Sequence, residues 1–155
     1  MPSGQIAVDD PCAKDVRELV ETHLLFARGQ TPPEDAHALD VDELLDPSVT
    51  LFSFRRERKL LAVGALKRLD DAHAELKSMH THQLARGQGI GREMLKHLLA
   101  VARTRGFRRV SIETGSMSAF APARALYASA GFRECPPFGD YTSSPNSTYM
   151  TLSLD

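Results

Sequence analysis

Three glycines at alternate positions, in the stretch Arg86-Gly87-Gln88-Gly89-Ile90-Gly91, restrict the fold of this chain more than any other feature. The stretch lies between a strand-like run, Ala74 to Thr81, and a run with helical apolar spacing that begins at Ile90. Glycine has no Cβ, so the backbone N–H groups of such a turn stay uncovered where the strand gives way to the helix. Uncovered N–H groups at the positive end of a helix dipole bind phosphate. The sequence therefore predicts a phosphate-binding turn inside a mixed α/β domain.

Two common nucleotide-binding turns do not fit the residues around these glycines. The dinucleotide pattern G-x-G-x-x-G requires glycine at position 92 or 94, where the chain has Arg92 and Met94. About five residues also separate the strand from Gly87, whereas a dinucleotide-binding turn follows its strand directly. A Walker A loop requires Gly-Lys-Ser or Gly-Lys-Thr, and the sequence contains neither. A flexible turn that starts a helix without any ligand remains the plain alternative.

Apolar periodicity and turn residues predict the other elements. Helices are expected at Lys14 to Ala27, Asp35 to Leu45, Arg92 to Arg105 (with the apolar spacing starting at Ile90), and Pro122 to Ala130. Strands are expected at Ile6 to Val8, Val49 to Phe54, Leu60 to Leu69, Ala74 to Thr81, Val110 to Glu113, Phe132 to Cys135, and Tyr149 to Leu154. The three strands between positions 49 and 81 are expected to form an antiparallel meander. The order β-α-α-β-β-β-α-β-α-β-β predicts one mixed α/β domain over residues 1–155.

Composition limits the partners and the compartment. A formal net charge of −1 gives no global reason to expect nucleic acid, and no apolar run reaches the ~18–20 residues of a membrane span. The first residues lack the basic and apolar regions of a signal peptide. The cysteines match neither a disulfide framework nor a zinc pattern, and His80 and His82, alternating on a strand, make only a weak metal site. We therefore expect a cytoplasmic protein with no metal, nucleic acid or membrane partner.

The glycine turn resembles the R/Q-x-x-G-x-G/A signature of the GNAT superfamily of acyl-CoA-dependent N-acetyltransferases. The strand Glu75 to Thr81 lies where that family has its fourth strand, and Leu126 to Phe132 matches its LYxxxGF motif. One bacterial branch is closer still, because it carries ETGxxxAFxPAxxLY and C-x-PFGDY, found here at Glu113 to Tyr127 and Cys135 to Tyr141. The resemblance covers nearly the whole chain. It implies the GNAT fold, with a mixed sheet whose fourth and fifth strands splay apart at the centre.

The same resemblance implies an activity. It predicts an acetyl-CoA-dependent N-acetyltransferase that moves an acetyl group to a primary amine by direct attack of the amine on the thioester. The acceptor is left open among small molecules, amino acids and peptides. An acyl-CoA-binding sensor without turnover is the alternative from another class. Homodimers occur among relatives of this kind, so a homodimer is possible here.

The resemblance also assigns residues to acetyl-CoA. The pyrophosphate is expected on the turn and the residue after it, namely Arg86, Gly87, Gln88, Gly89, Ile90, Gly91 and Arg92. The pantetheine arm is expected to add like an extra strand beside Met79, His80 and Thr81. A backbone N–H near Met79 or His80 would polarise the thioester oxygen. Where many relatives have an asparagine seven residues before the tyrosine, this chain has Phe120, so either the backbone replaces that contact or the ring packs on the pantetheine arm.

Tyr127 is the predicted general acid that protonates the departing CoA thiolate. It shares the buried stripe of its helix with Ala123 and Ala130, and its hydroxyl is expected to point to where the sulfur emerges. A core tyrosine with a satisfied hydroxyl is the alternative.

Glu75 is the predicted general base. Strict alternation would place Glu75, Lys77 and Met79 on the face opposite Leu76 and Ser78. A strand-end glutamate paired with Lys77 or Arg68 remains equally open, and Glu113, which ends the neighbouring strand, is a second candidate base.

Acceptor specificity is expected from the first two helices and from the loops Gln30 to Glu34 and Pro136 to Pro145. Asp140 is a candidate contact for a cationic acceptor, with a turn-capping role as the alternative. The mixture of Phe26, His37, Asp42 and Tyr141 in these regions indicates no particular acceptor.

Overall fold

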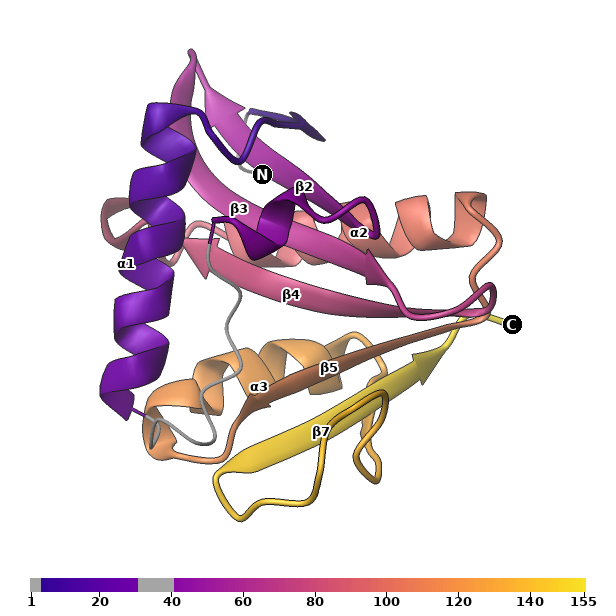
Figure 1. Ribbon diagram of the computed structural model, residues 1–155. Coiled ribbons are helices and arrows are strands. Elements are labelled where there is room, and N and C mark those ends of the chain that lie inside the picture. Colours follow the sequence, from indigo (N-terminus) through magenta and orange to yellow (C-terminus); the bar gives the residue numbers. More distant parts are fainter. Residues whose placement is uncertain (1–3, 31–40) are drawn as a thin grey trace.

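The computed structural model describes residues 4–30 and 41–155, and its centre is a mixed seven-stranded β-sheet (Figure 1). The strands are β1 Gln5–Val8, β2 Val49–Arg56, β3 Lys59–Arg68, β4 His73–Thr81, β5 Arg109–Gly115, β6 Arg133–Glu134 and β7 Ser147–Ser153. They lie in the order β1-β2-β3-β4-β5-β7-β6. Neighbouring strands are antiparallel except β4 and β5, which run parallel. The predicted antiparallel meander is confirmed as β2, β3 and β4.

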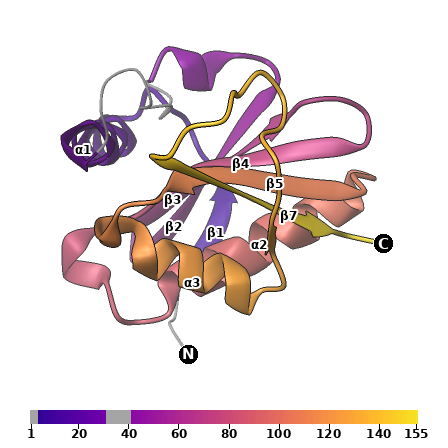
Figure 2. The same cartoon turned by 90° about the horizontal axis from the view of Figure 1, so that it is seen from below.

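Helices cover both faces of the sheet (Figure 2). Helix α1 (Lys14–Gln30) lies on one face, and α2 (Ile90–Thr104) and α3 (Ala121–Ser129) lie on the other. The apolar stripe of α1 packs on the sheet through Val16, Leu19 and Val20, in contact with Leu51 and Val63. The stripe of α2 joins the larger core on the opposite face. Each helix follows the predicted apolar spacing, because a 3.6-residue repeat places that stripe on one side. The mixed α/β architecture is thus confirmed.

Some boundaries differ from the predicted ones. Residues 35–40 of the expected second helix lie outside the described residues, and the part after them contains only the 3₁₀ turn η2 (Glu43–Leu45). The loop positions 31–34 and His37 also lie outside the described residues. Strand β6 is two residues long, whereas β7 begins two residues before the expected start. The longer β7 follows from its continuous ladder with β5, from Arg109↔Ser153 to Gly115↔Ser147. Among the described residues, no helix is both long enough and apolar enough to cross a membrane.

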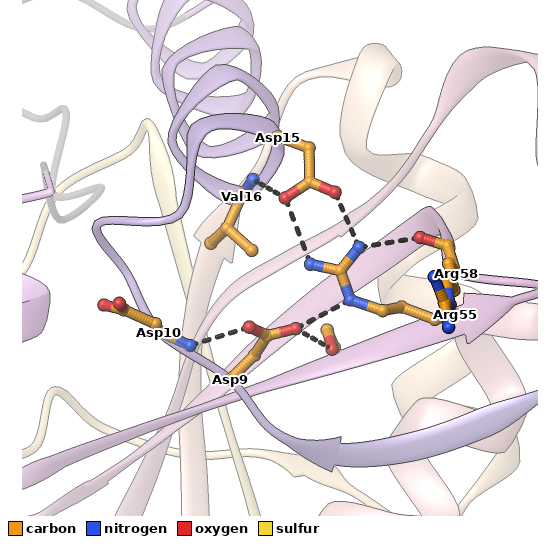
Figure 3. Close-up of polar contacts among 7 residues, drawn as sticks. Asp9, Asp10, Asp15, Val16, Arg55 and Arg58 are labelled. Carbon is orange, nitrogen blue, oxygen red and sulfur yellow. Dashed lines mark hydrogen bonds and ion pairs between the residues drawn. The ribbon is translucent and has the colours of Figure 1, made fainter.

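Arg55, near the end of β2, connects the start of α1 to the sheet (Figure 3). Its Nη1 and Nη2 donate to the carboxylate of Asp15 at 2.6 and 3.0 Å, and its Nε donates to Asp9 at 2.9 Å. Asp9 also accepts a hydrogen bond from the Ser53 hydroxyl. Bidentate pairing of a guanidinium with a carboxylate restrains orientation as well as distance. This contact therefore fixes the first turn of α1 over the β1–β2 edge.

The sheet opens at its centre. Strands β4 and β5 pair only from His73↔Arg109 to Glu75↔Ser111, and past that point they diverge. Strand β4 also carries a bulge, because Ser78 and Met79 together stand opposite the single residue Gly64 of β3. Ser78 has a positive φ of 55° there. A bulge adds one residue to one strand and increases the local twist. The predicted central splay is present, and the bulge lies at its start.

Candidate active site

A cavity of about 380 Å³ occupies the gap between the diverging strands. Its walls include residues 76–81 of β4 and residues 112–115 of β5. Helix α1 contributes on one face of the sheet, and α2 and α3 contribute on the other. The cavity therefore passes through the plane of the sheet, so two molecules approaching from opposite faces can meet inside it.

The bulge at Ser78 decides which side chains of β4 point to which face. Leu76 packs in the core beneath α2, and so does Met79, since a Cβ placed on Gly64 would meet both Met79 and Leu98 of α2. His80 lies on the α1 face, where it contacts His23. Strict alternation would have put residues 79 and 80 on the opposite faces. The bulge reverses this, because a one-residue insertion exchanges the faces of all the residues that follow it. The prediction that Met79 shares a face with Glu75 is therefore wrong.

The glycine turn forms one end of the cavity. Gly87 and Gly89 have φ angles of 80° and 78°, and α2 begins directly afterwards at Ile90. Positive φ is costly for residues with a Cβ, so glycine is the residue type that permits this entry into the helix. Gly91, in the first turn of α2, lines the cavity. The N–H groups of this first helical turn have no earlier helical carbonyl to bind, which leaves them for an anion.

Three arginines surround the turn. Arg56 donates to the Gln88 side chain at 3.2 Å, and Arg92 donates to the Ser129 hydroxyl at 3.3 Å. Arg86 lines the cavity, and its Nε donates to the Thr81 carbonyl at 3.4 Å. The positive charge of these groups adds to the helix dipole. The structure thus places Arg86, Gly87, Gln88, Gly89, Ile90, Gly91 and Arg92 together as a basic cradle whose backbone N–H groups suit a pyrophosphate.

The middle of the cavity offers hydrogen-bonding groups to an extended ligand. Beyond Glu75, the edge of β4 that faces β5 is not paired with it. Ser78 lines the cavity, and its buried hydroxyl has no hydrogen-bonding partner among the described residues. A buried hydroxyl without a hydrogen bond destabilises the fold, and a polar ligand that bonds to it would remove that cost. An extended chain with amide groups matches both features, since amides can bond to a strand edge and to a hydroxyl.

Tyr127 lines the cavity from α3 and is 3% exposed. Its ring meets Phe132 edge-on with 5.8 Å between centroids. Burial raises the pKa of the Tyr127 hydroxyl well above its ordinary value of 10. The hydroxyl therefore keeps its proton at neutral pH and is available as a donor. The structure places Tyr127 on the buried stripe, as predicted, and in the wall of the cavity.

Glu75 is buried but does not line the cavity. Its Oε2 accepts a 2.6 Å hydrogen bond from the Tyr141 hydroxyl and lies 3.4 Å from Nζ of Lys77. The Lys77 ammonium also donates to the Tyr141 hydroxyl at 2.7 Å and does line the cavity. These contacts match the alternative to a general base given above, in which Glu75 pairs with Lys77. Glu113, the second candidate base, lines the cavity directly.

Phe120 contributes an aromatic wall to the cavity. Its ring meets Phe26 of α1 edge-on with 5.3 Å between centroids, across the gap in the sheet. It also packs directly on Gly115, where a Cβ would clash with the ring. The position that holds an asparagine in many relatives is therefore filled here by a ring that bridges β5 and α1. Asp140, by contrast, is exposed and does not line the cavity.

His23 of α1 belongs to the site and was not predicted from the sequence. It lines the cavity, and its Nδ1 lies 3.1 Å from Nδ1 of His80. Burial lowers the pKa of each ring to about 4, and the Lys77 charge adds to this for His23 as the Arg86 charge does for His80. No local motif marks such a pair, because 57 residues separate its members. Within the described ranges, no three His, Cys, Asp or Glu side chains cluster as they would around a metal ion.

Comparison with known proteins identifies the family and the fold. The pattern of the acetyltransferase (GNAT) family matches residues 14–132. The chain is 43% identical over 149 residues to the uncharacterized N-acetyltransferase YsnE of Bacillus subtilis, covering 96% of this chain and 99% of that one. It is 42% identical over 149 residues to the uncharacterized N-acetyltransferase YedL of Escherichia coli, covering 96% and 94%. A GNAT family acetyltransferase from Elizabethkingia anophelis, solved with acetyl-CoA bound, has the same fold at a TM-score of 0.74 and 19% identity, covering 99% of this chain and 100% of that one.

Proposed function

This chain belongs to the acetyltransferase (GNAT) family and is an N-acetyltransferase, and from that premise we propose that it transfers the acetyl group of acetyl-CoA to a primary amine. The acceptor is a small molecule, an amino acid or a peptide. The observation that carries the proposal is the cavity through the open sheet, with the glycine cradle at one end and Tyr127 in its wall. The motifs at Glu113 to Tyr127 and Cys135 to Tyr141 favour the bacterial branch that carries them.

The donor occupies the α2 and α3 side in this proposal. The pyrophosphate lies on the N–H groups from Arg86 to Gly91 and beside Arg92, where the positive charge gathers. The pantetheine arm follows the unpaired edge of β4 beside Met79, His80 and Thr81. A backbone N–H of Met79 or His80 polarises the thioester oxygen. Phe120 packs against the arm in place of the asparagine contact.

Tyr127 is the proposed general acid. The departing sulfur carries negative charge as its bond to the acetyl carbon breaks, and a hydroxyl in the same cavity can donate its proton. Glu75 and Glu113 are the carboxylates proposed as general bases from the sequence. Glu113 is placed to act on an acceptor directly, whereas Glu75 is placed to hold Lys77 and Tyr141.

The acceptor enters from the α1 side. The walls there include Phe26 and Phe120, whose rings form a continuous aromatic surface. Apolar and aromatic lining favours ligands that bury apolar area. We therefore propose that the amine is attached to an apolar or aromatic body. A cytoplasmic location remains a prediction from the sequence.

Two measurements test the proposal. Isothermal titration should show binding of acetyl-CoA, and a panel of aromatic monoamines, amino acids and short peptides should reveal an amine that releases free CoA thiol. Binding together with amine-dependent thiol release is the expected result. Binding without release on the whole panel would support the sensor without turnover, and the absence of acetyl-CoA binding would contradict both functions.

A further inference from the structure

The rings of His23 and His80 form a direct contact inside the cavity. Their Nδ1 atoms are 3.1 Å apart, the centroids are 5.0 Å apart, and the planes meet at 62°. One ring comes from α1 and the other from β4 just after the bulge. Both line the cavity on the side from which the acceptor enters. The pair is therefore in reach of the groups that react.

A hydrogen bond between two Nδ1 atoms restricts the protons on both rings. One ring must donate its Nδ1–H, and the other must accept with a bare Nδ1. In the neutral pair, the donating ring then has a bare Nε2 and the accepting ring has an Nε2–H. Such a pair always presents one nitrogen that can take a proton and one that can release it.

Burial keeps the pair neutral at physiological pH, and the charges around it add to this effect. Lys77 of β4 faces His23, while Arg86 and His82 face His80. Burial of the rings, together with these groups, lowers the pKa of each ring to about 4. A neutral imidazole is a proton acceptor, whereas an imidazolium is not. The low basicity still suffices, because the attacking nitrogen becomes strongly acidic once it has bonded to the acetyl carbon.

Of the two candidate carboxylates, one competes with the pair for this step. The Glu75 carboxylate lies outside the cavity lining and binds Tyr141 and Lys77. Glu113 lines the cavity from β5, across the gap from His80, and is the alternative that the experiment below distinguishes. His80 follows directly after Met79, whose backbone N–H is a proposed contact of the thioester oxygen. The His80 ring therefore belongs to the residue directly after the N–H group that is proposed to bind the thioester oxygen.

We propose that His23 and His80 form a two-ring proton relay that takes the proton from the acceptor nitrogen during acetyl transfer. This inference rests on the proposed function. In the step, the bond between nitrogen and the acetyl carbon forms and the bond between carbon and sulfur breaks. The nitrogen gives one proton to the bare Nε2, the Nδ1 proton passes to the second ring, and its Nε2–H releases a proton to water. The rings then hold exchanged tautomers, and proton exchange with water through the two Nε2 atoms restores the starting pair before the next turnover. Tyr127 protonates the thiolate and regains its proton from water, so the protons balance.

Alanine substitutions with chemical rescue test the relay. His23→Ala and His80→Ala should each lower kcat by ~100-fold with the fastest amine of the panel, in line with the usual size of general base catalysis. Acetyl-CoA affinity by titration should stay within about twofold, since neither side chain is needed for the cradle. Added imidazole should restore part of the rate, and a series of substituted imidazoles should show rates that rise with imidazole pKa. A role in packing alone would give no such dependence.

The matched control is His97→Ala. His97 lies on α2, contacts the Phe52 ring, and does not line the cavity. Its kcat should stay near that of the unmodified protein, with no response to imidazole. A general loss of activity in this variant as well would point to destabilisation and not to proton transfer.

Nitrogen-15 NMR of the histidine rings gives a readout that needs no turnover. The relay requires one ring protonated at Nδ1 and the other at Nε2 at pH 7. Two rings both protonated at Nε2 would overturn the inference, and so would unchanged kcat in both alanine variants. Loss of acetyl-CoA binding in the unmodified protein would instead contradict the proposed function itself. Loss of rate in Glu113→Gln, together with full rates in the histidine variants, would assign the proton to Glu113.

Discussion

The hydroxyl of Tyr141 donates a 2.6 Å hydrogen bond to Oε2 of Glu75. Tyr141 lies in the loop before β7, and Glu75 is the last residue of β4 that pairs with β5. The contact therefore joins the loop before β7 to β4 at the point where β4 and β5 begin to diverge. Burial and the Glu75 charge raise the pKa of the Tyr141 hydroxyl above its ordinary value, so it stays a donor. The loop with the PFGDY motif thus stabilises the floor of the cavity.

Glu75→Gln tests whether this carboxylate is structural. Glutamine can still accept the bond from Tyr141, but the negative charge beside Lys77 is lost. We expect the free energy of unfolding to fall by about 1–3 kcal/mol, as for a weakened buried charged hydrogen bond. The dependence of kcat on pH should keep its shape. Chemical denaturation and a pH–rate profile check both points, and loss of the rising limb of the profile would restore Glu75 as the general base.

Tyr127→Phe should lower kcat by ~10-fold or more while acetyl-CoA affinity stays near normal, because only the proton donor is removed. Stopped reactions with thiol detection and a binding titration measure the two quantities. Tyr149→Phe is the control, since Tyr149 donates to the Thr142 carbonyl and does not line the cavity. A kcat for Tyr127→Phe that matches the unmodified protein at all pH values would remove Tyr127 from the mechanism.

Gly91→Ala should stabilise the fold without weakening acetyl-CoA binding. A Cβ at this position would meet Leu126 at 3.6 Å and Thr81 at 3.7 Å, which are ordinary contacts. Alanine also favours a helix over glycine by ~0.8–1 kcal/mol, so the melting temperature should hold or rise. The family signature R/Q-x-x-G-x-G/A accepts alanine at this position, so we expect the affinity for acetyl-CoA to stay within about twofold. Gly29→Ala, on an open position of α1, should likewise leave the affinity unchanged. A tenfold loss of affinity confined to Gly91→Ala would show that the turn requires glycine at position 91.

Arg55→Met should destabilise the protein in a pH-dependent way (Figure 3). Burial raises the pKa of Asp9, but hydrogen bonds from Ser53 and Arg55 outweigh it and lower that pKa overall. Hydrogen bonds from Arg55 lower the pKa of Asp15, and burial opposes this. A lowered folded-state pKa gives stability that is present above the unfolded value of about 4 and is lost as the pH falls through the folded value. We expect a loss of about 1.5–3 kcal/mol at pH 7, mostly through Asp9, because Asp15 is half exposed.

Urea denaturation at pH 7 and at pH 3 measures this effect. The difference between Arg55→Met and the unmodified protein should shrink at pH 3, where both carboxylates take up protons. Arg58→Met is the control, since Arg58 meets Arg55 only through its backbone carbonyl. A difference that stays constant with pH would show that packing, and not charge, makes the contribution of Arg55.

Several features of the site depend on pairing between distant segments, and the sequence did not reveal them. Strict alternation along β4 predicted one face for Met79, whereas the bulge opposite Gly64 exchanges the faces of Met79 and His80. A bulge is set by the register with the neighbouring strand, which local periodicity does not contain. The contact between His23 and His80 follows from that exchange and from the position of α1 over the splay. The Arg55 contacts likewise join segments that are remote in the chain.

The sequence by itself determined the glycine turn before α2, the buried Tyr127, the meander and the family, because each depends on residues close together in the chain. A glycine at positive φ, a helical stripe and an alternating strand are local consequences of backbone sterics and apolar spacing. Only the tertiary structure decided which groups line the cavity on its α1 side. In the folded chain, Glu75 contacts Tyr141 and Lys77, and His23 contacts His80 in the cavity. The physical reason is that side-chain direction at the splay depends on strand register and helix placement, which only the packed chain defines.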